Sequence, residues 1–261
     1  METKRNVKFF IAPPISIPMI IGLVILAVSI FFVCFEDSRL GGIIGIIVAL
    51  MVLVFSSGSK SDETDIDYQA QQLTRDLQEE SMKKFDVYEK NFLKMMKPID
   101  FTGFDFEPKE EVVYFKKGKD GTPRTNYFAS YNLIFTGEKM YLYGKRVSLT
   151  DEEINEVKAA SYKYTELDHA ELLEKTFTPE KGEPVTYYVF KIIAKDGSAV
   201  LDTCINYGAD ADKALEDINR AIVVRTEELK KKAEEKAIKL KEFREKVMAG
   251  EADLPADEGF I

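Results

Sequence analysis

The stretch EVVYFKKGKDGTPRTNYFASYNLIFTGEKMYLYGKRVSL, residues 111–149, decides the fold. Apolar and polar residues alternate through much of it, which is the period of a strand with one buried face. Two clusters of turn residues interrupt the alternation, GKDGTP at 118–123 and TGEK at 136–139. The stretch therefore predicts three antiparallel strands joined by short turns, at 111–117, 124–135 and 140–149.

More strands and a closing helix follow this stretch. After a short charged excursion that begins at Thr150, a Tyr-Lys-Tyr strand is expected at 162–164. The alternation then predicts three further strands, at 170–178, 185–194 and 199–206. Asp210 is the expected N-cap of a helix. Its apolar stripe is expected to pack on the sheet and consists of Ala211, Leu215, Ile218 and Ile222.

The helix is expected to continue beyond the sheet as an extension over 225–250. Nine basic and six acidic residues lie between Arg225 and Lys246, which predicts a solvated helix with i,i+4 ion pairs. Residues 251–261 are expected to form a flexible tail.

A long helix is predicted ahead of the strands, over 62–97. Its apolar residues recur every three or four positions, Asp62 is the expected N-cap, and Pro98 ends the pattern. Two interpretations stay open. The helix is either a stalk or layer along the following domain, or a coiled coil that pairs two copies of the chain.

The first 56 residues differ in composition from the rest, because they hold 7 of the 81 charged residues. Two apolar runs, 15–35 and 40–56, predict a hairpin of two transmembrane helices. A secretory signal peptide is the competing interpretation. The first apolar run is too long for one, and no small-residue cleavage site follows it.

Basic residues set the expected orientation of this hairpin. Lys4, Arg5 and Lys8 lie in the tail 1–14, whereas the connecting turn holds one basic residue beside two acidic ones. This distribution predicts a multi-pass protein of the inner cell membrane with both termini in the cytoplasm.

Small residues are spaced four apart in the second apolar run. Gly41, Gly45 and Ala49 lie on one helix face, which allows a second helix to approach closely. That second helix belongs either to the hairpin itself or to another protein chain.

The order of elements carries a resemblance to a known family. The runs KKGKDGTPRTNYFASYNLIFTGEKMYLYGKRVSLTDEE, SYKYTELDHAELLE and YYVFKIIAKDGSAVLDTC precede the helix ADKALEDINRAI. Together they resemble bacterial membrane proteins with two N-terminal spans, a helical linker and a pleckstrin-homology-like (PH-like) cytoplasmic domain. The resemblance implies an α+β fold with a PH-like domain over 101–224, an antiparallel sheet closed by a C-terminal helix. It implies no activity, because that family is itself largely uncharacterised.

Composition and motifs exclude several classes of function. The net charge of −9 is too acidic for a general nucleic-acid binder, and two cysteines are too few for a disulfide scaffold. His169 is the only histidine, and the sequence has neither a phosphate-binding glycine loop nor a dinucleotide fingerprint. We therefore expect no metal, no cofactor and no catalytic residues.

One cluster of basic residues, which we call the basic turn, is a candidate binding site. It surrounds the first predicted turn of the sheet and consists of Lys116, Lys117, Lys119 and Arg124. Cationic side chains at the open end of a PH-like sheet are suited to phosphate or anionic headgroups. The competing interpretation is a solvated rim without a specific ligand.

These observations predict a non-enzymatic binding or scaffolding protein that presents a PH-like domain at the cytoplasmic face of a membrane. Its expected partners are membrane lipids, an unidentified protein and, through the long helices, a second copy of the chain. The alternative is an accessory or regulatory subunit of a larger membrane complex. An enzyme is a third interpretation, although nothing selects a catalytic pair among the 45 carboxylates.

Overall fold

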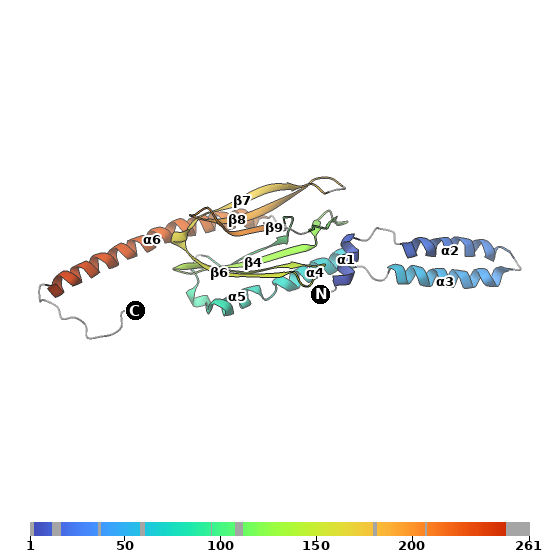
Figure 1. Ribbon diagram of the computed structural model, residues 1–261, viewed down its shortest axis with the longest axis horizontal. Helices are drawn as coiled ribbons and strands as arrows, with labels where there is room; N and C mark the ends of the chain where they lie inside the picture. Colours follow the sequence, from blue (N-terminus) through green and yellow to red (C-terminus); the bar gives the residue numbers. More distant parts are fainter. Residues whose placement is uncertain are drawn as a thin grey trace.

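A β body lies at the centre of an elongated molecule, with helices projecting from both ends (Figure 1). The structure is a computed structural model, and it describes residues 3–11, 17–35, 38–57, 61–94, 96–107, 112–179, 182–206 and 208–248. The predicted tail 251–261 lies outside the described residues.

Two antiparallel sheets form the β body. The larger has the order β1 (Ile99–Phe104), β4 (Tyr127–Phe135), β5 (Lys139–Ser148), β6 (Asn155–Lys163). The smaller has the order β7 (Leu167–Phe177), β8 (Val185–Ala194), β9 (Ala199–Ile205). The sheets meet where the Asn206 N–H donates a hydrogen bond to the Thr102 carbonyl at 2.8 Å. A small ribbon of β2 (Phe115–Lys117) and β3 (Pro123–Thr125) lies beside them.

The hydrophobic core lies between the two sheets and the first half of α6 (Ala209–Met248). All nine residues of β4 are buried. Phe101 of β1 stacks on Phe190 of β8 with ring centroids 4.1 Å apart. Ile218 and Ile222 of α6 complete this cluster, as the stripe of apolar residues predicts.

The predicted long helix 62–97 is divided into shorter pieces. These are α4 (Glu63–Thr74), α5 (Leu77–Phe85) and the 3₁₀ turn η2 (Glu89–Asn91). Asp62 caps α4 as expected, and its side chain accepts a hydrogen bond from the Asp65 N–H at 2.8 Å. Asp86 ends α5 in a left-handed conformation with φ of 51°. The division lets the apolar stripe follow the larger sheet, where Ile66 and Leu77 are buried.

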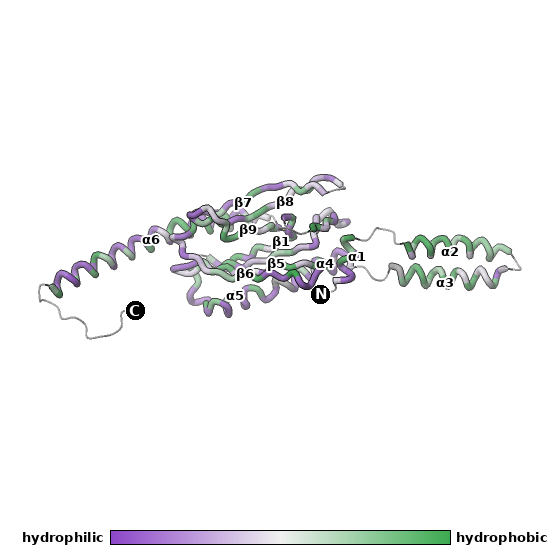
Figure 2. Tube along the Cα trace, in the orientation of Figure 1, coloured by the Kyte–Doolittle hydropathy of each residue, from purple (hydrophilic) through white to green (hydrophobic). Residues whose placement is uncertain are grey.

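The N-terminal helices are α1 (Thr3–Ile11), α2 (Ile17–Val33) and α3 (Arg39–Ser57). α2 and α3 lie antiparallel and form what we call the apolar hairpin, which projects from one end of the β body (Figure 1). Figure 2 shows that hydrophobic residues cover most of its length. Large apolar side chains are exposed along it, among them Leu40 and Phe55.

The two predicted membrane spans, 15–35 and 40–56, are wrong. Among the residues that the structure describes, no helix combines the length and the apolar character that a membrane crossing requires. α2 has 17 residues, about 26 Å of helix against a hydrocarbon core of about 30 Å. The predicted multi-pass location in the inner membrane depended on these spans and is wrong as well. What the structure supports is an α+β fold with antiparallel sheets and a long C-terminal helix.

Candidate functional site

The structure encloses one residue of the basic turn inside the protein. Arg124 of β3 has a side chain that is 2% exposed, and it lies between Asp67 of α4 and Asp120 of the β2–β3 turn. Its Nε and Nη2 donate to the Asp67 carboxylate at 2.8 and 2.7 Å. Its Nη1 and Nη2 donate to the Asp120 carboxylate at 3.0 and 2.7 Å. Both carboxylates therefore bind the same guanidinium in a bidentate manner.

These bonds fix the protonation states of the cluster. The hydrogen bond from Arg124 holds the pKa of the Asp120 carboxyl well below its usual range. The hydrogen bonds to Asp67 and Asp120 raise the pKa of the Arg124 guanidinium further. Arg124 therefore remains charged, and its charge is matched within the chain.

Two lysines of the basic turn also take part in contacts, one with α1 and the other with α4. The Lys116 ammonium donates to the Phe9 carbonyl at 3.0 Å and lies 3.7 Å from the centroid of the Phe9 ring. It thus binds the C-terminal turn of α1, where a cation is favoured. The Lys119 backbone N–H donates to the Glu63 carboxylate at 2.9 Å, at the first turn of α4. The side chains of Lys117 and Lys119 are exposed.

A buried polar contact joins α1 to the segment after the apolar hairpin. Asn6 is fully buried, and its Nδ2 donates to Gln69 Oε1 at 2.8 Å and to the Leu149 carbonyl at 2.9 Å. The Ser61 hydroxyl donates to Asn6 Oδ1 at 2.6 Å. We call these contacts, together with those of Arg124 and Lys116, the junction. The junction holds α1 and the start of α4, which precede and follow the apolar hairpin in the sequence, against the β body.

Small residues of α3 pack against α2 within the same chain. A Cβ atom on Gly45 would overlap the Ser29 hydroxyl of α2, so the two helices touch at this point. Ala49 is fully buried. A Cβ on Gly41 would meet no atom within 4 Å. The close approach at Gly45 is therefore a contact inside the hairpin.

A buried ion pair that sequence reasoning missed lies between the two sheets. Arg146 of β5 donates to the Asp105 carboxylate at 2.7 Å, and both side chains are nearly enclosed. Cys204 of β9 lies 3.5 Å from the same carboxylate. Burial and the Asp105 charge raise the pKa of the Cys204 thiol to about 12. The thiol therefore stays protonated, which is unsuited to a nucleophile.

A second charged group lies nearer the surface of the same region. Glu107 accepts hydrogen bonds from the Lys175 ammonium at 2.7 Å and from the Tyr187 hydroxyl. Although burial raises the pKa of Glu107, these two hydrogen bonds outweigh it and lower the pKa. Glu107 therefore acts as a fixed anion that joins the segment after β1 to strands β7 and β8.

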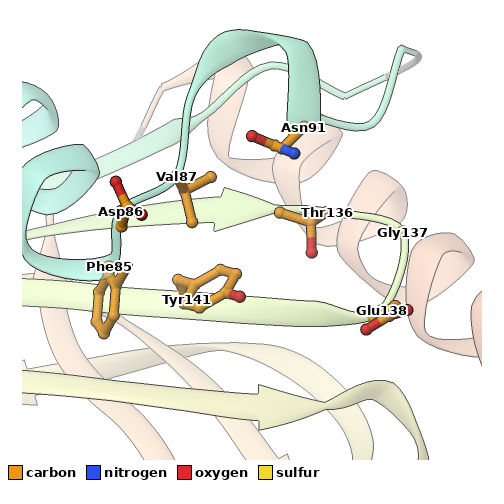
Figure 3. Close-up of a pocket in the computed structure, with 8 residues that line it drawn as sticks. All are labelled: Phe85, Asp86, Val87, Asn91, Thr136, Gly137, Glu138 and Tyr141. Carbon is orange, nitrogen blue, oxygen red and sulfur yellow. The ribbon is translucent and has the colours of Figure 1, made fainter. Parts of the chain in front are cut away.

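A pocket of about 360 Å³ lies beside the end of α5 (Figure 3). Asp86 and Glu138 lie at opposite ends of it, with the Tyr141 ring between them. Two of its polar side chains already have partners: Asp86 accepts from the Tyr88 hydroxyl at 2.8 Å, and Asn91 accepts from the Tyr88 N–H at 3.2 Å. The pocket therefore presents no nucleophile with an adjacent base.

The remaining chemical groups do not converge on a centre. His169 is exposed on β7 and lies 2.8 Å from its neighbour Asp168. Within the part of the chain that the structure describes, no group of three histidine, cysteine or carboxylate residues could hold a metal ion.

Comparison with known proteins gives no assignment. No protein-family model matches the chain, and no curated protein and no solved structure is similar enough to count as a match.

Proposed function

We propose that the chain is a non-enzymatic scaffolding protein, in which the β body holds two projecting helical elements in a fixed relation. These elements are the apolar hairpin at one end and the second half of α6 at the other (Figure 1). The junction is the single observation that carries the proposal. Its bidentate ionic contacts and its buried amide network fix α1 and α4, the helices on either side of the hairpin in the sequence, to the β body.

The other end of the body supports the same proposal. The first half of α6 lies in the main core through Ile218 and Ile222, both almost fully buried. A helix that is anchored in this way continues without interruption to Met248. Its direction relative to the β body is therefore set by packing.

The nature of the body fits a binding or scaffolding role. Antiparallel sheets followed by one C-terminal amphipathic helix are the order of elements that the PH-like proposal requires. In addition, the buried ionisable groups are engaged in structural pairs such as Asp105 with Arg146. Such pairing supports a role in which the body supplies rigidity.

A second candidate, an accessory subunit of a larger assembly, is favoured by one specific observation. Large apolar side chains of the hairpin are exposed over its whole length, including Phe31 at 61% and Phe55 at 82%. Contiguous exposed apolar surface of this kind is typical of an interaction site.

Site-specific photo-crosslinking tests the proposal. A benzophenone amino acid is placed at Ile44 of the hairpin, at Leu240 of α6 or at His169 of the sheet, all exposed positions. A scaffold yields adducts with other proteins from both Ile44 and Leu240 in cells that express the full chain. His169 is the control position and should yield none.

The outcomes separate the candidates. If only Ile44 yields adducts, and these contain one other protein in a one-to-one ratio with the chain, the result favours the accessory subunit. Absence of adducts at both Ile44 and Leu240 contradicts both candidates.

A further inference from the structure

The second half of α6 extends away from the β body as an isolated helix (Figure 1). We call residues 230–248 the C-terminal arm. The first half of α6 is covered by the core, and the last buried residue is Thr226, whose hydroxyl donates to the Tyr164 carbonyl at 3.0 Å. Every residue from 230 to 246 is exposed.

The apolar stripe that packs on the sheet does not end where the sheet ends. Ile218, Ile222 and Leu229 belong to or pack on the core. At the same helical position the arm continues the stripe with Ala233, Leu240, Phe243 and Val247. Leu240 is 45% exposed and Phe243 is 40% exposed. A stripe with this three-and-four spacing is the seam by which one helix packs on another.

Charge is divided sharply between the two sides of the arm. With about 100° between successive residues, the half that carries the stripe holds four cations and no carboxylate between 230 and 247: Lys232, Lys236, Lys239 and Arg244. The opposite half holds all four acidic residues of the arm: Glu234, Glu235, Glu242 and Glu245. This cationic seam occurs in a chain whose net charge is −9.

We infer that the C-terminal arm binds an acidic amphipathic helix of a partner protein along this seam. The inference rests on the proposed scaffolding function and names the partner class for one of its two ends. Leucine-sized side chains of the partner would cover Leu240 and Phe243. Glutamates or aspartates flanking them would pair with the lysines at the edges of the seam.

The charges disfavour two other occupants. A second copy of the arm would bring lysine rows together whether the helices ran parallel or antiparallel, because cations flank both edges of the seam. A lipid surface requires a broad apolar face. Here Ala233 and Lys236 lie along the stripe. Within the arm, the stripe contains only three large apolar residues, Leu240, Phe243 and Val247.

The test measures binding of the full chain to a designed probe. The probe is a 21-residue peptide helix with leucine at heptad positions a and d and glutamate at e and g, and the control peptide has lysine at e and g. Fluorescence anisotropy at 50 and 500 mM NaCl should show at least tenfold tighter binding of the glutamate peptide. Its affinity should fall at the higher salt concentration.

Two double variants with the same change in net charge locate the site. Lys232→Glu with Lys239→Glu reverses charge beside the seam and should weaken binding of the glutamate peptide at least tenfold. Lys231→Glu with Lys241→Glu places the same two negative charges on the half of the helix opposite the seam, and Lys241 lies nearer the border of that half. This double variant should change the affinity for the glutamate peptide less than twofold. All four lysines are exposed, so neither variant disturbs the core.

Several results overturn the inference. These are equal binding of the two peptides, equal loss in the two double variants, or binding of phosphatidylglycerol vesicles without binding of the peptide. Concentration-dependent dimerisation that Lys232→Glu with Lys239→Glu strengthens would assign the seam to a second copy. Failure of the peptide while Leu240 still yields crosslinks excludes the partner class and leaves the scaffolding function in place.

Discussion

At the scale of single residues, Arg124 of the basic turn has a buried charge that joins two elements of the fold. Four of its hydrogen bonds go to Asp67 and Asp120, and its side chain is 2% exposed. The sequence shows Arg124 in a run of basic residues at a turn, where a solvated side chain is expected. Sequence reasoning could not find Asp67, because that partner lies 57 residues away on another element. A contact between distant elements leaves no local pattern in the sequence.

Replacement of Arg124 by methionine is expected to destabilise the protein. The substitution leaves Asp67 and Asp120 without their common cation, although both are partly exposed and water can solvate them. We therefore expect a loss of about 2–3 kcal/mol in the free energy of unfolding, at the lower limit for a broken buried pair. Urea denaturation followed by circular dichroism measures it.

The matched control is Lys117→Met in the same small ribbon. Lys117 is exposed, so its replacement should change the free energy of unfolding by less than about 0.5 kcal/mol. Equal effects of the two substitutions would contradict the structural role of Arg124.

At the scale of elements, the period of the sequence predicted the strands that have a buried face. β4, β5, β8 and β9 lie where the alternation of apolar residues placed them. Only the end of β6 was predicted, by the Tyr-Lys-Tyr strand at 162–164, because β6 runs through a mostly exposed segment, NEVKAASYK, that has no apolar alternation. β1 was missed because it is only six residues long and begins directly after Pro98. The break in helix 62–97 was missed because Asp76 and Asp86 are also acceptable inside an exposed helix face.

The close approach of α2 and α3 makes a prediction about two glycines. Gly45→Ala places a methyl group against the Ser29 hydroxyl. This overpacking should lower the free energy of unfolding by about 1–3 kcal/mol. Gly41→Ala meets open space and should gain up to about 1 kcal/mol in helix propensity. Hydrogen exchange of the α2 and α3 amides should accelerate in the first variant only. Equal protection in the two variants would contradict the observed packing.

The junction makes a prediction about the orientation of the apolar hairpin. Cys34 is exposed near the tip of the hairpin and Cys204 is buried, so a spin label attaches selectively at Cys34. A second label at Lys117→Cys, beside the junction, completes the pair. Double electron–electron resonance should give one narrow distance distribution, because α1 and α4 are both fixed to the β body.

The same measurement with Arg124→Met in addition should give a broader distribution. A broad distribution already present with Arg124 intact would show that the junction does not orient the hairpin.

At the scale of the whole molecule, three hydrogen-bonded carboxylates make the free energy of unfolding depend on pH in the acidic range. Hydrogen bonds from Arg124, from Lys145 and from Lys175 with Tyr187 leave the pKa values of Asp120, Glu80 and Glu107 below their ordinary values. A carboxyl with a lowered pKa in the folded state stabilises the protein above its unfolded pKa of about 4. This stabilisation is lost as the pH falls through the lower, folded value.

The urea midpoint should therefore be similar at pH 7 and pH 5 and should fall between pH 5 and pH 3. Glu80 and Glu107 together should account for about 1 kcal/mol of the loss, because both are more than one-third exposed and screened by solvent. Asp120→Asn removes one of the three titrating groups, so its midpoint should fall less between these pH values. A midpoint that is constant down to pH 3 would contradict this assignment.

Sequence and structure diverge most at the N-terminal end of the molecule. The composition set the first 56 residues apart as one apolar unit, but the structure divides them, because α1 packs against the β body whereas α2 and α3 pack on each other. The first predicted span, 15–35, differs from the structure in its length. α2 begins at Ile17 and ends at Val33 and is shorter than the 21-residue run from which it was predicted.

The contacts of Ser61 with α1 bring the chain before the hairpin next to the chain after it, so the hairpin is an insertion that a short loop could replace. The Ser61 N–H donates to the Arg5 carbonyl at 3.4 Å, and its hydroxyl binds Asn6. The chain therefore leaves the β body and returns to it at neighbouring points. Replacing the roughly 50 intervening residues by a six-residue loop lowers the entropic cost of closing this loop by about 2 kcal/mol. The β body is thus a natural host for domain grafting, in which a different helical pair could be installed without altering its core.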